Sequence, residues 1–71
     1  FAMPPVFSEL TAQERQIVAL IGAGKRNKEI ADALFLSEGT VKQYINRIYS
    51  KLQLEGTTNE KRFNLVALLK N

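Results

Sequence analysis

The chain has 71 residues, 45% of them hydrophobic, and a formal net charge of +3. A chain this short forms one domain and buries only about 60% of the surface that it exposes when unfolded, so its core is thin. It contains no cysteine and no histidine, which excludes disulfides, zinc fingers and Cys- or His-based catalysis. No run approaches the ~20 apolar residues of a membrane-spanning helix, and no signal-peptide pattern is present. Composition therefore favours a small cytoplasmic binding domain over an enzyme, and we expect no cofactor and no metal.

The placement of the basic residues is more informative than their number. From position 39 to position 54 all charged residues are basic, namely Lys42, Arg47 and Lys51. One basic stretch on a nearly neutral chain is typical of a protein that binds duplex DNA. A solvated helix face has the same composition, so charge alone leaves both interpretations open.

The start of the chain is expected to lie outside the domain. Residues 1–8 contain two prolines and show no periodicity, which predicts a linker or sequence foreign to the domain, with the domain itself over residues 9–71. The first helix begins at a capping box, in which Thr11 and Glu14 satisfy each other's backbone donors. Apolar residues then recur at helical spacing, and Gly24 is suited to the left-handed position that ends a helix.

Two further helices are predicted close together. A short one runs from about Asn27 to Leu34, and the apolar residues of the segment 35–37 indicate a packed turn. Ser37 then caps a third helix that extends to about Leu52. Its apolar positions are spaced i, i+4, i+7 and i+11 and form one narrow stripe: Val41, Ile45, Ile48 and Leu52. Two helices joined by so short a turn, the second capped by serine, form a helix-turn-helix pattern.

A fourth helix completes the predicted fold. Gly56 breaks the chain, and Thr57 with Glu60 forms a second capping-box pattern that opens a helix to about Lys70. Its apolar residues are too many for one narrow face. They are therefore as consistent with a place in the core as with a place in an interface. No strand is expected. The sequence predicts an all-α, four-helix, helix-turn-helix domain.

The third helix carries the candidate binding face. At about 100° per residue, the side opposite its apolar stripe is polar and has no carboxylate; it contains Gly39, Gln43, Asn46, Arg47 and Ser50, with Lys42 at the flank. A lysine can donate to guanine, and glutamine or asparagine can bond to adenine through two hydrogen bonds. Such a face is suited to the major groove, although ordinary solvated helices also carry amide side chains.

Four separated blocks of sequence have a wider resemblance. They are Leu-Thr-Ala-Gln-Glu-Arg at 10–15, Gly-Lys-Arg-Asn-Lys-Glu-Ile-Ala at 24–31, Ser-Glu-Gly-Thr-Val-Lys at 37–42 and Ile-Tyr-Ser-Lys-Leu at 48–52. In this order and spacing they resemble the LuxR-type DNA-binding domain over roughly residues 9–54. The resemblance implies a four-helix domain that binds promoter DNA to regulate transcription, often as the output half of a bacterial two-component response regulator. It also implies dimerisation through the fourth helix.

Carried over position by position, the resemblance assigns roles to individual residues. The implied base contacts are Lys42, Gln43 and Asn46. The implied DNA-backbone contacts are Asn27, Lys28, Thr40, Tyr44, Arg47 and Lys51. The dimer interface is expected at Leu65, Leu68 and Leu69. The expected partners are double-stranded promoter DNA and a second copy of the chain on that DNA, with RNA polymerase as a further candidate; no membrane and no small-molecule ligand is expected.

Three features depart from the family pattern. Tyr44 stands where the family usually has histidine. Gly39 occupies a position that normally holds a larger residue, which costs about 1 kcal/mol of helix propensity but lets another backbone come close. The segment 55–61 is several residues longer than the family's short link to the fourth helix. If Arg62 corresponds to the family's arginine there, the dimer-forming end is re-aimed.

Several of these residues also have purely structural interpretations. Glu14 and Glu29 are expected to cap helices or form ion pairs rather than bind a ligand. Asn27 is as well suited to cap the second helix as to contact a phosphate, and Lys51 to interact with the dipole at a helix end. At least one of the two tyrosines is expected in the core.

Two other functions remain open. A sigma-like, polymerase-associated helix-turn-helix would bind promoters only together with polymerase. A protein-interaction domain that uses the leucines of the fourth helix would show no salt-dependent duplex binding. RNA recognition is disfavoured because the chain lacks the aromatic stacking surface of common RNA modules.

Overall fold

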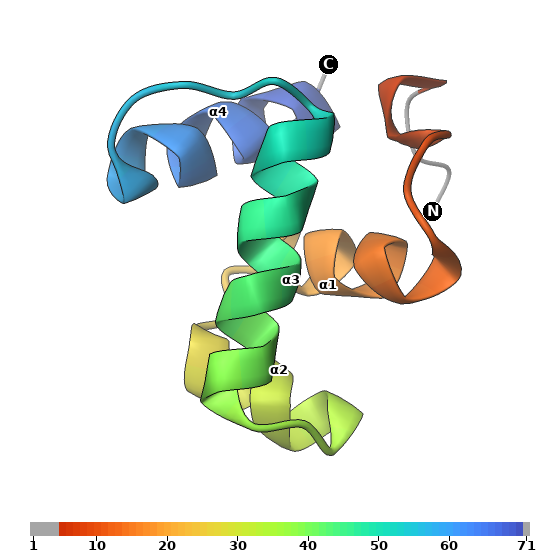
Figure 1. Cartoon of the computed structure of the whole chain (residues 1–71), viewed down its shortest axis with the longest axis vertical. Coiled ribbons are helices and arrows are strands. Elements are labelled where there is room, and N and C mark those ends of the chain that lie inside the picture. Colours follow the sequence, from red (N-terminus) through yellow and green to blue (C-terminus); the bar gives the residue numbers. More distant parts are fainter. Residues whose placement is uncertain (1–4, 71) are drawn as a thin grey trace.

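The computed structural model describes residues 5–70. They form a short 3-10 helix, η1 (Pro5–Phe7), and four α-helices: α1 (Ala12–Gly22), α2 (Asn27–Leu34), α3 (Glu38–Lys51) and α4 (Thr58–Lys70). No strand occurs in this range, so the all-α, four-helix prediction is confirmed. Helix α3 runs through the middle of the domain, with α2 at its N-terminal end, α1 beside its middle and α4 at its C-terminal end (Figure 1).

Both predicted capping boxes are present. The Glu14 backbone N–H donates to Thr11 Oγ1 at 3.2 Å, and the Thr11 N–H donates to Glu14 Oε1 at 2.8 Å. The Glu60 N–H likewise donates to Thr57 Oγ1 at 3.2 Å, and the Thr57 N–H to Glu60 Oε1 at 2.9 Å. Helices α1 and α4 therefore begin where their local sequence places them, because the orphan donors of the first turn are satisfied by neighbouring side chains.

Helices α1, α2 and α3 end in the same backbone motif. After each of them one residue turns left-handed, and the next N–H donates back to a carbonyl of the last turn. The three left-handed residues are Gly24 (φ 83°), Phe35 (φ 58°) and Gln53 (φ 56°). The returning bonds run from Lys25 to Leu20, from Leu36 to Ala31 and from Leu54 to Tyr49. Only the first of the three motifs uses glycine, the residue that adopts this conformation without strain.

The core lies among α1, α2 and α3 and is closed by two residues that precede α1 and by one residue of α4. Its buried hydrophobic residues are Phe7, Leu10, Ile17, Val18, Ile21, Ile30, Ala31, Val41, Ile45, Ile48, Tyr49 and Leu65. Phe7 is fully buried, so the expectation that residues 1–8 form only a linker is wrong at this position, and the packed domain begins before residue 9. Residues 1–4 of that predicted linker lie outside the described residues.

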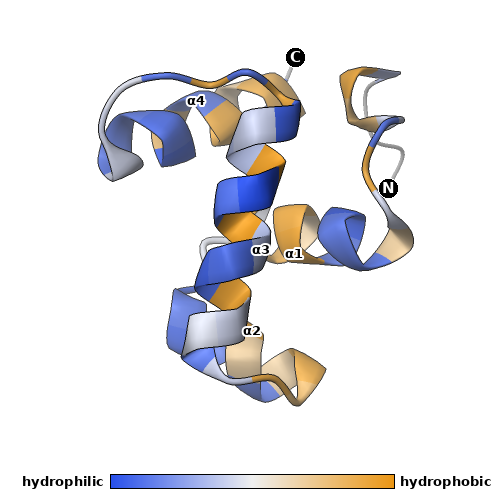
Figure 2. Cartoon of the chain, in the orientation of Figure 1, coloured by the Kyte–Doolittle hydropathy of each residue, from blue (hydrophilic) through white to orange (hydrophobic). Residues whose placement is uncertain are grey.

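The connection between α3 and α4 ends at the capping box that the sequence predicted. Of the predicted long link over 55–61, residues 58–61 form the first turn of α4. This part of the segment is therefore helical and is not a loop. This helix is hydrophilic in its first half and hydrophobic in its second (Figure 2), and Leu65 at their junction is fully buried. None of the helices in the described range is long and apolar enough to cross a membrane.

Candidate nucleic-acid interface

Helix α3 separates its two faces as the sequence predicted. Val41, Ile45 and Ile48 are buried, whereas Lys42, Gln43 and Asn46 are exposed. Hydrophilic and hydrophobic residues consequently alternate from turn to turn along α3 (Figure 2). The three candidate base-contacting residues thus lie on the solvent side of a helix whose other side is fixed in the core. Their contact with bases stays a prediction.

The N-terminal end of α3 is held by its cap. Ser37 Oγ accepts a hydrogen bond from the Thr40 N–H at 3.1 Å and donates one to Thr40 Oγ1 at 2.9 Å. Ser37 is therefore the N-cap that the sequence predicted. Because the Thr40 hydroxyl accepts this bond, it has a structural role besides its candidate role at the DNA backbone, for which it keeps its own O–H donor.

Tyr44 and Arg47 interact on the flank of α3. The Arg47 guanidinium lies over the Tyr44 ring, 5.5 Å from its centroid. Tyr44 is half-buried and packs against the core, whereas Arg47 is exposed. This cation–π contact places the Arg47 charge beside the recognition face while leaving its N–H donors accessible. The expectation of one core tyrosine is met by Tyr49, which is 2% exposed.

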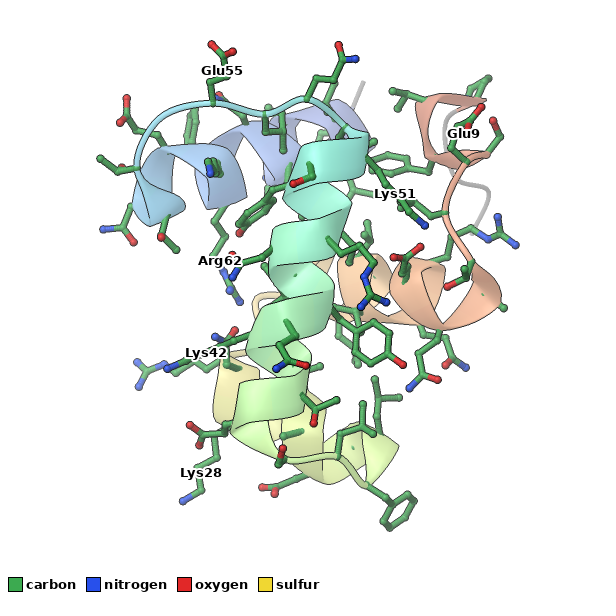
Figure 3. All side chains as sticks on the ribbon, in the orientation of Figure 1. Glu9, Lys28, Lys42, Lys51, Glu55 and Arg62 are labelled. Carbon is green, nitrogen blue, oxygen red and sulfur yellow. The ribbon has the colours of Figure 1, made fainter. Side chains whose placement is uncertain are left out.

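Lys51 forms an ion pair with a buried carboxylate of α1. Its Nζ donates to Glu14 Oε1 at 2.7 Å, and the Glu14 side chain is 1% exposed. In Figure 3, Lys51 extends from α3 on the side opposite to Lys42. The ammonium compensates a buried carboxylate, and the expected contact of Lys51 with the DNA backbone stays a prediction. The stretch 39–54 is free of acids in sequence, but α1 supplies one in space.

The start of α2 is built differently from the prediction. Arg26 is the N-cap, and Glu29 Oε1 accepts a hydrogen bond from its backbone N–H at 2.9 Å. The interpretation of Asn27 as the cap is therefore wrong. Its Oδ1 instead accepts a hydrogen bond from Arg62 Nη1 of α4 at 3.1 Å. Lys28 is exposed and lies on the same side of α3 as Lys42 and Arg62 (Figure 3).

Arg62 also belongs to this surface, although the sequence predicted no binding role for it. Besides its bond to Asn27, its Nη2 donates to the Lys25 carbonyl. The α4 helix is thereby attached to the beginning of α2. These contacts join residues 35 and 37 positions apart, and the one available signal was the likeness of Arg62 to the family's arginine after the third helix.

The candidate dimer residues divide into two groups. Leu65 is fully buried within the chain, so it offers no surface to a partner and its expected place in the interface is wrong. Leu68 and Leu69 are half-buried and pack against the core. The large exposed hydrophobic residue of α4 is Phe63, which is 73% exposed. A dimer interface on α4 remains a prediction, and Phe63 is its most accessible apolar side chain.

These features define a helix-turn-helix domain: α2 and α3 pack together across a three-residue turn, and α3 presents a polar, carboxylate-free face. The profile of the family described as bacterial regulatory proteins, luxR family, matches residues 8–60. The chain belongs to this family, and the resemblance seen in the four sequence blocks is confirmed.

Relatives of known name carry the same domain. The chain is 49% identical over 51 residues to the DNA-binding transcriptional activator DevR/DosR of Mycobacterium tuberculosis, a match that covers 72% of this chain and 24% of the relative. It is 42% identical over 55 residues to the transcriptional regulatory protein LnrK of Bacillus subtilis, covering 78% and 25%. For LiaR of the same organism the identity is 47% over 49 residues, covering 69% and 23%. The chain spans about a quarter of the length of these relatives.

Proposed function

We propose that this domain binds double-stranded promoter DNA in a sequence-specific manner, with α3 in the major groove. The observation that carries the proposal is the exposed polar face of α3, on which Lys42, Gln43 and Asn46 are presented by a helix anchored through its opposite side. Lysine is suited to guanine, and the two amides to adenine. The name of DevR/DosR, a DNA-binding transcriptional activator, supports the same function.

Contacts to the DNA backbone would come from the residues around that face. Lys28 at the start of α2 and Arg47 on α3 are exposed cations, and Thr40 and Tyr44 offer hydroxyl groups beside them. Asn27 keeps its amide N–H donors, because its contact with Arg62 uses only Oδ1. Such contacts fix the register of α3 on the duplex, whereas the base contacts select the sequence.

The wider role follows from the family. We infer a transcription regulator acting in the bacterial cytoplasm, with this domain as the C-terminal output of a two-component response regulator and no catalytic role for the domain itself. Two copies would pair on DNA through α4, and RNA polymerase is a candidate partner once bound. The named relatives favour this function over a sigma-like factor and over a domain that binds only protein.

Selection of bound sequences from a random duplex pool tests the proposal. We expect one enriched motif at about 0.1 M salt, and binding that weakens steeply as salt rises, by roughly one slope unit per phosphate neutralised. The matched control is the Asn46→Ala variant, which should enrich a less defined motif. Binding that is independent of salt, or enrichment of no motif by the wild-type chain, would refute the proposed function.

A further inference from the structure

A cleft of about 330 Å³ lies beside the recognition face. One turn after another of α3 contributes to it, and the first residues of α2 and α4 close its sides. Its polar lining residues are Asn27, Lys42, Asn46, Tyr49, Thr58 and Arg62. Two of these carry positive charge, four are neutral hydrogen-bonding side chains, and none is a carboxylate.

The two cations of the cleft have no counter-ion. Among residues 5–70 the ion pair found is that of Lys51 with Glu14, so neither Lys42 nor Arg62 is neutralised. Arg62 is half-buried, and both of its hydrogen bonds go to neutral oxygens. A guanidinium has five N–H donors in a planar fork, so it retains donors for a further acceptor. A partly buried, uncompensated cation is favourable only where an anion can approach it.

Tyr49 supplies an independent observation. Its side chain lines the cleft and is 2% exposed, and its hydroxyl has no hydrogen-bond partner within the described part of the chain. Burial raises the pKa of this phenol, and the charge of the neighbouring Arg62 and its hydrogen bonding toward the hydroxyl act in the opposite direction. The hydroxyl therefore lies beside the Arg62 guanidinium without a hydrogen bond of full geometry, so it can donate to an anion that the guanidinium attracts.

We propose, on the basis of the DNA-binding function above, that this cleft binds one phosphate group of the DNA backbone, with Arg62 as its principal contact. Lys42 adds positive charge to the cleft from α3 while its ammonium reads a base, and the Tyr49 hydroxyl donates once the guanidinium shifts toward the anion. Fork-shaped donors are suited to the paired oxygens of a phosphate. Helix α4 thereby contributes directly to DNA binding in addition to any role in pairing two copies.

The test compares duplex affinity across salt concentrations for the wild-type chain, Arg62→Gln and Tyr49→Phe. The charge-matched control is Lys70→Gln at the far end of α4. We expect Arg62→Gln to lower affinity roughly fivefold to tenfold and to reduce the salt slope by about one unit. Tyr49→Phe should lower affinity about threefold with little change in thermal stability, because the lost hydroxyl makes no hydrogen bond of full geometry within residues 5–70. This second variant decides the matter if Arg62→Gln fails to fold.

Two further measurements identify the source of the phosphate. Phosphate-ethylation interference should show one sensitive position per half-site for the wild-type chain and its loss in Arg62→Gln. A titration with inorganic phosphate, followed by NMR of the Arg62 side chain, detects a free-anion site instead. The proposal would be overturned if inorganic phosphate saturated the site while wild type and Arg62→Gln gave identical interference patterns. It would also be overturned if Tyr49→Phe bound the duplex as tightly as the wild type. If the wild-type chain binds no duplex at all, the proposed function fails and this inference fails with it.

Discussion

Lys51 Nζ and Thr11 N–H donate to the same oxygen, Oε1 of Glu14, at 2.7 and 2.8 Å. Glu14 therefore caps α1 and at the same time joins α1 to the last turn of α3. Its side chain is 1% exposed, and its second oxygen, Oε2, has no partner within residues 5–70. This buried, charged contact thus adds to the apolar packing that positions the recognition helix on the domain.

Removing the ammonium from this contact should destabilise the fold without affecting the DNA surface. Lys51→Met leaves Glu14 buried and uncompensated, which should lower the free energy of unfolding by about 2 kcal/mol. This is less than the ~3–5 kcal/mol of fully buried pairs, because Lys51 itself is one-third exposed. Urea denaturation measures the change, and the exposed Lys28→Met is the control, expected within about 0.5 kcal/mol of wild type. A folded Lys51→Met chain that has lost duplex binding would show that Lys51 also contacts DNA.

The same contact should make the Lys51→Met defect dependent on pH. Burial raises the pKa of Glu14, but the hydrogen bonds from Lys51 and Thr11 and the Lys51 charge outweigh it, so the pKa is lowered from 4.5. A carboxyl group whose pKa is lower in the folded than in the unfolded chain stabilises the fold at pH values above its unfolded pKa. This stabilisation is lost as the pH falls through its folded pKa. The penalty of Lys51→Met should therefore be full near about pH 7 and shrink toward about pH 3. A penalty that is constant over this range would show that packing, not charge, connects the two residues.

The end of α3 offers a stabilising substitution. Gln53 is exposed and adopts φ 56°, in the backbone motif that Gly24 forms after α1 at φ 83°. A side chain in the left-handed region costs roughly 1–2 kcal/mol, so Gln53→Gly should raise the free energy of unfolding by about 1 kcal/mol. Gly24→Ala is the reverse control and should lower it by a similar amount. Thermal denaturation of both variants checks the pair, and a lower melting temperature for Gln53→Gly would contradict the assigned conformation.

Local patterns account for the features that the sequence predicted well. The capping residues of α1 and α4 lie within three positions of their partners, and the stripe on α3 repeats at helical spacing, so both can be recognised in a short window. The Arg62–Asn27 bond joins distant parts of the chain, and no local pattern specifies it. The prediction that Leu65 lies in a dimer interface is wrong because the second half of α4 is apolar on several sides, and only packing decides which leucine faces inward. Phe7 was missed because a lone aromatic residue beside two prolines shows no periodicity.

Base reading and backbone positioning should separate in binding experiments. Asn46 is exposed on the outer face of α3, and Lys28 is exposed on α2. Asn46→Ala should lose roughly 1–3 kcal/mol at particular base pairs, whereas Lys28→Ala should weaken all duplexes about equally and reduce the salt slope by about one. Titration of a set of single-base variants of the selected site distinguishes the two. An unchanged sequence preference for Asn46→Ala would place a different face of α3 in the groove.

Pairing of two copies on DNA gives the last prediction. One recognition helix reads only a few base pairs, so discrimination among the many sites of a genome requires more contacts. A two-fold dimer doubles them and requires dyad-related half-sites about one helical turn apart. On α4, Phe63 is 73% exposed, whereas Leu65 is buried and Leu68 packs inward. A lysine at position 68 would therefore also damage the core, and position 63 gives the cleaner test.

Phe63→Lys should abolish cooperative binding to a duplex with two half-sites while leaving binding to a single half-site intact, because it places like charges at the two-fold axis without removing a core residue. The exposed Phe35, which is 96% exposed and lies in the turn before α3, provides the control: Phe35→Lys adds the same charge far along the chain from α4 and should leave cooperativity unchanged. Titrating both duplexes with both variants, with the melting temperature of each measured in parallel, checks the prediction. Cooperativity that survives Phe63→Lys would exclude this face of α4 from the dimer.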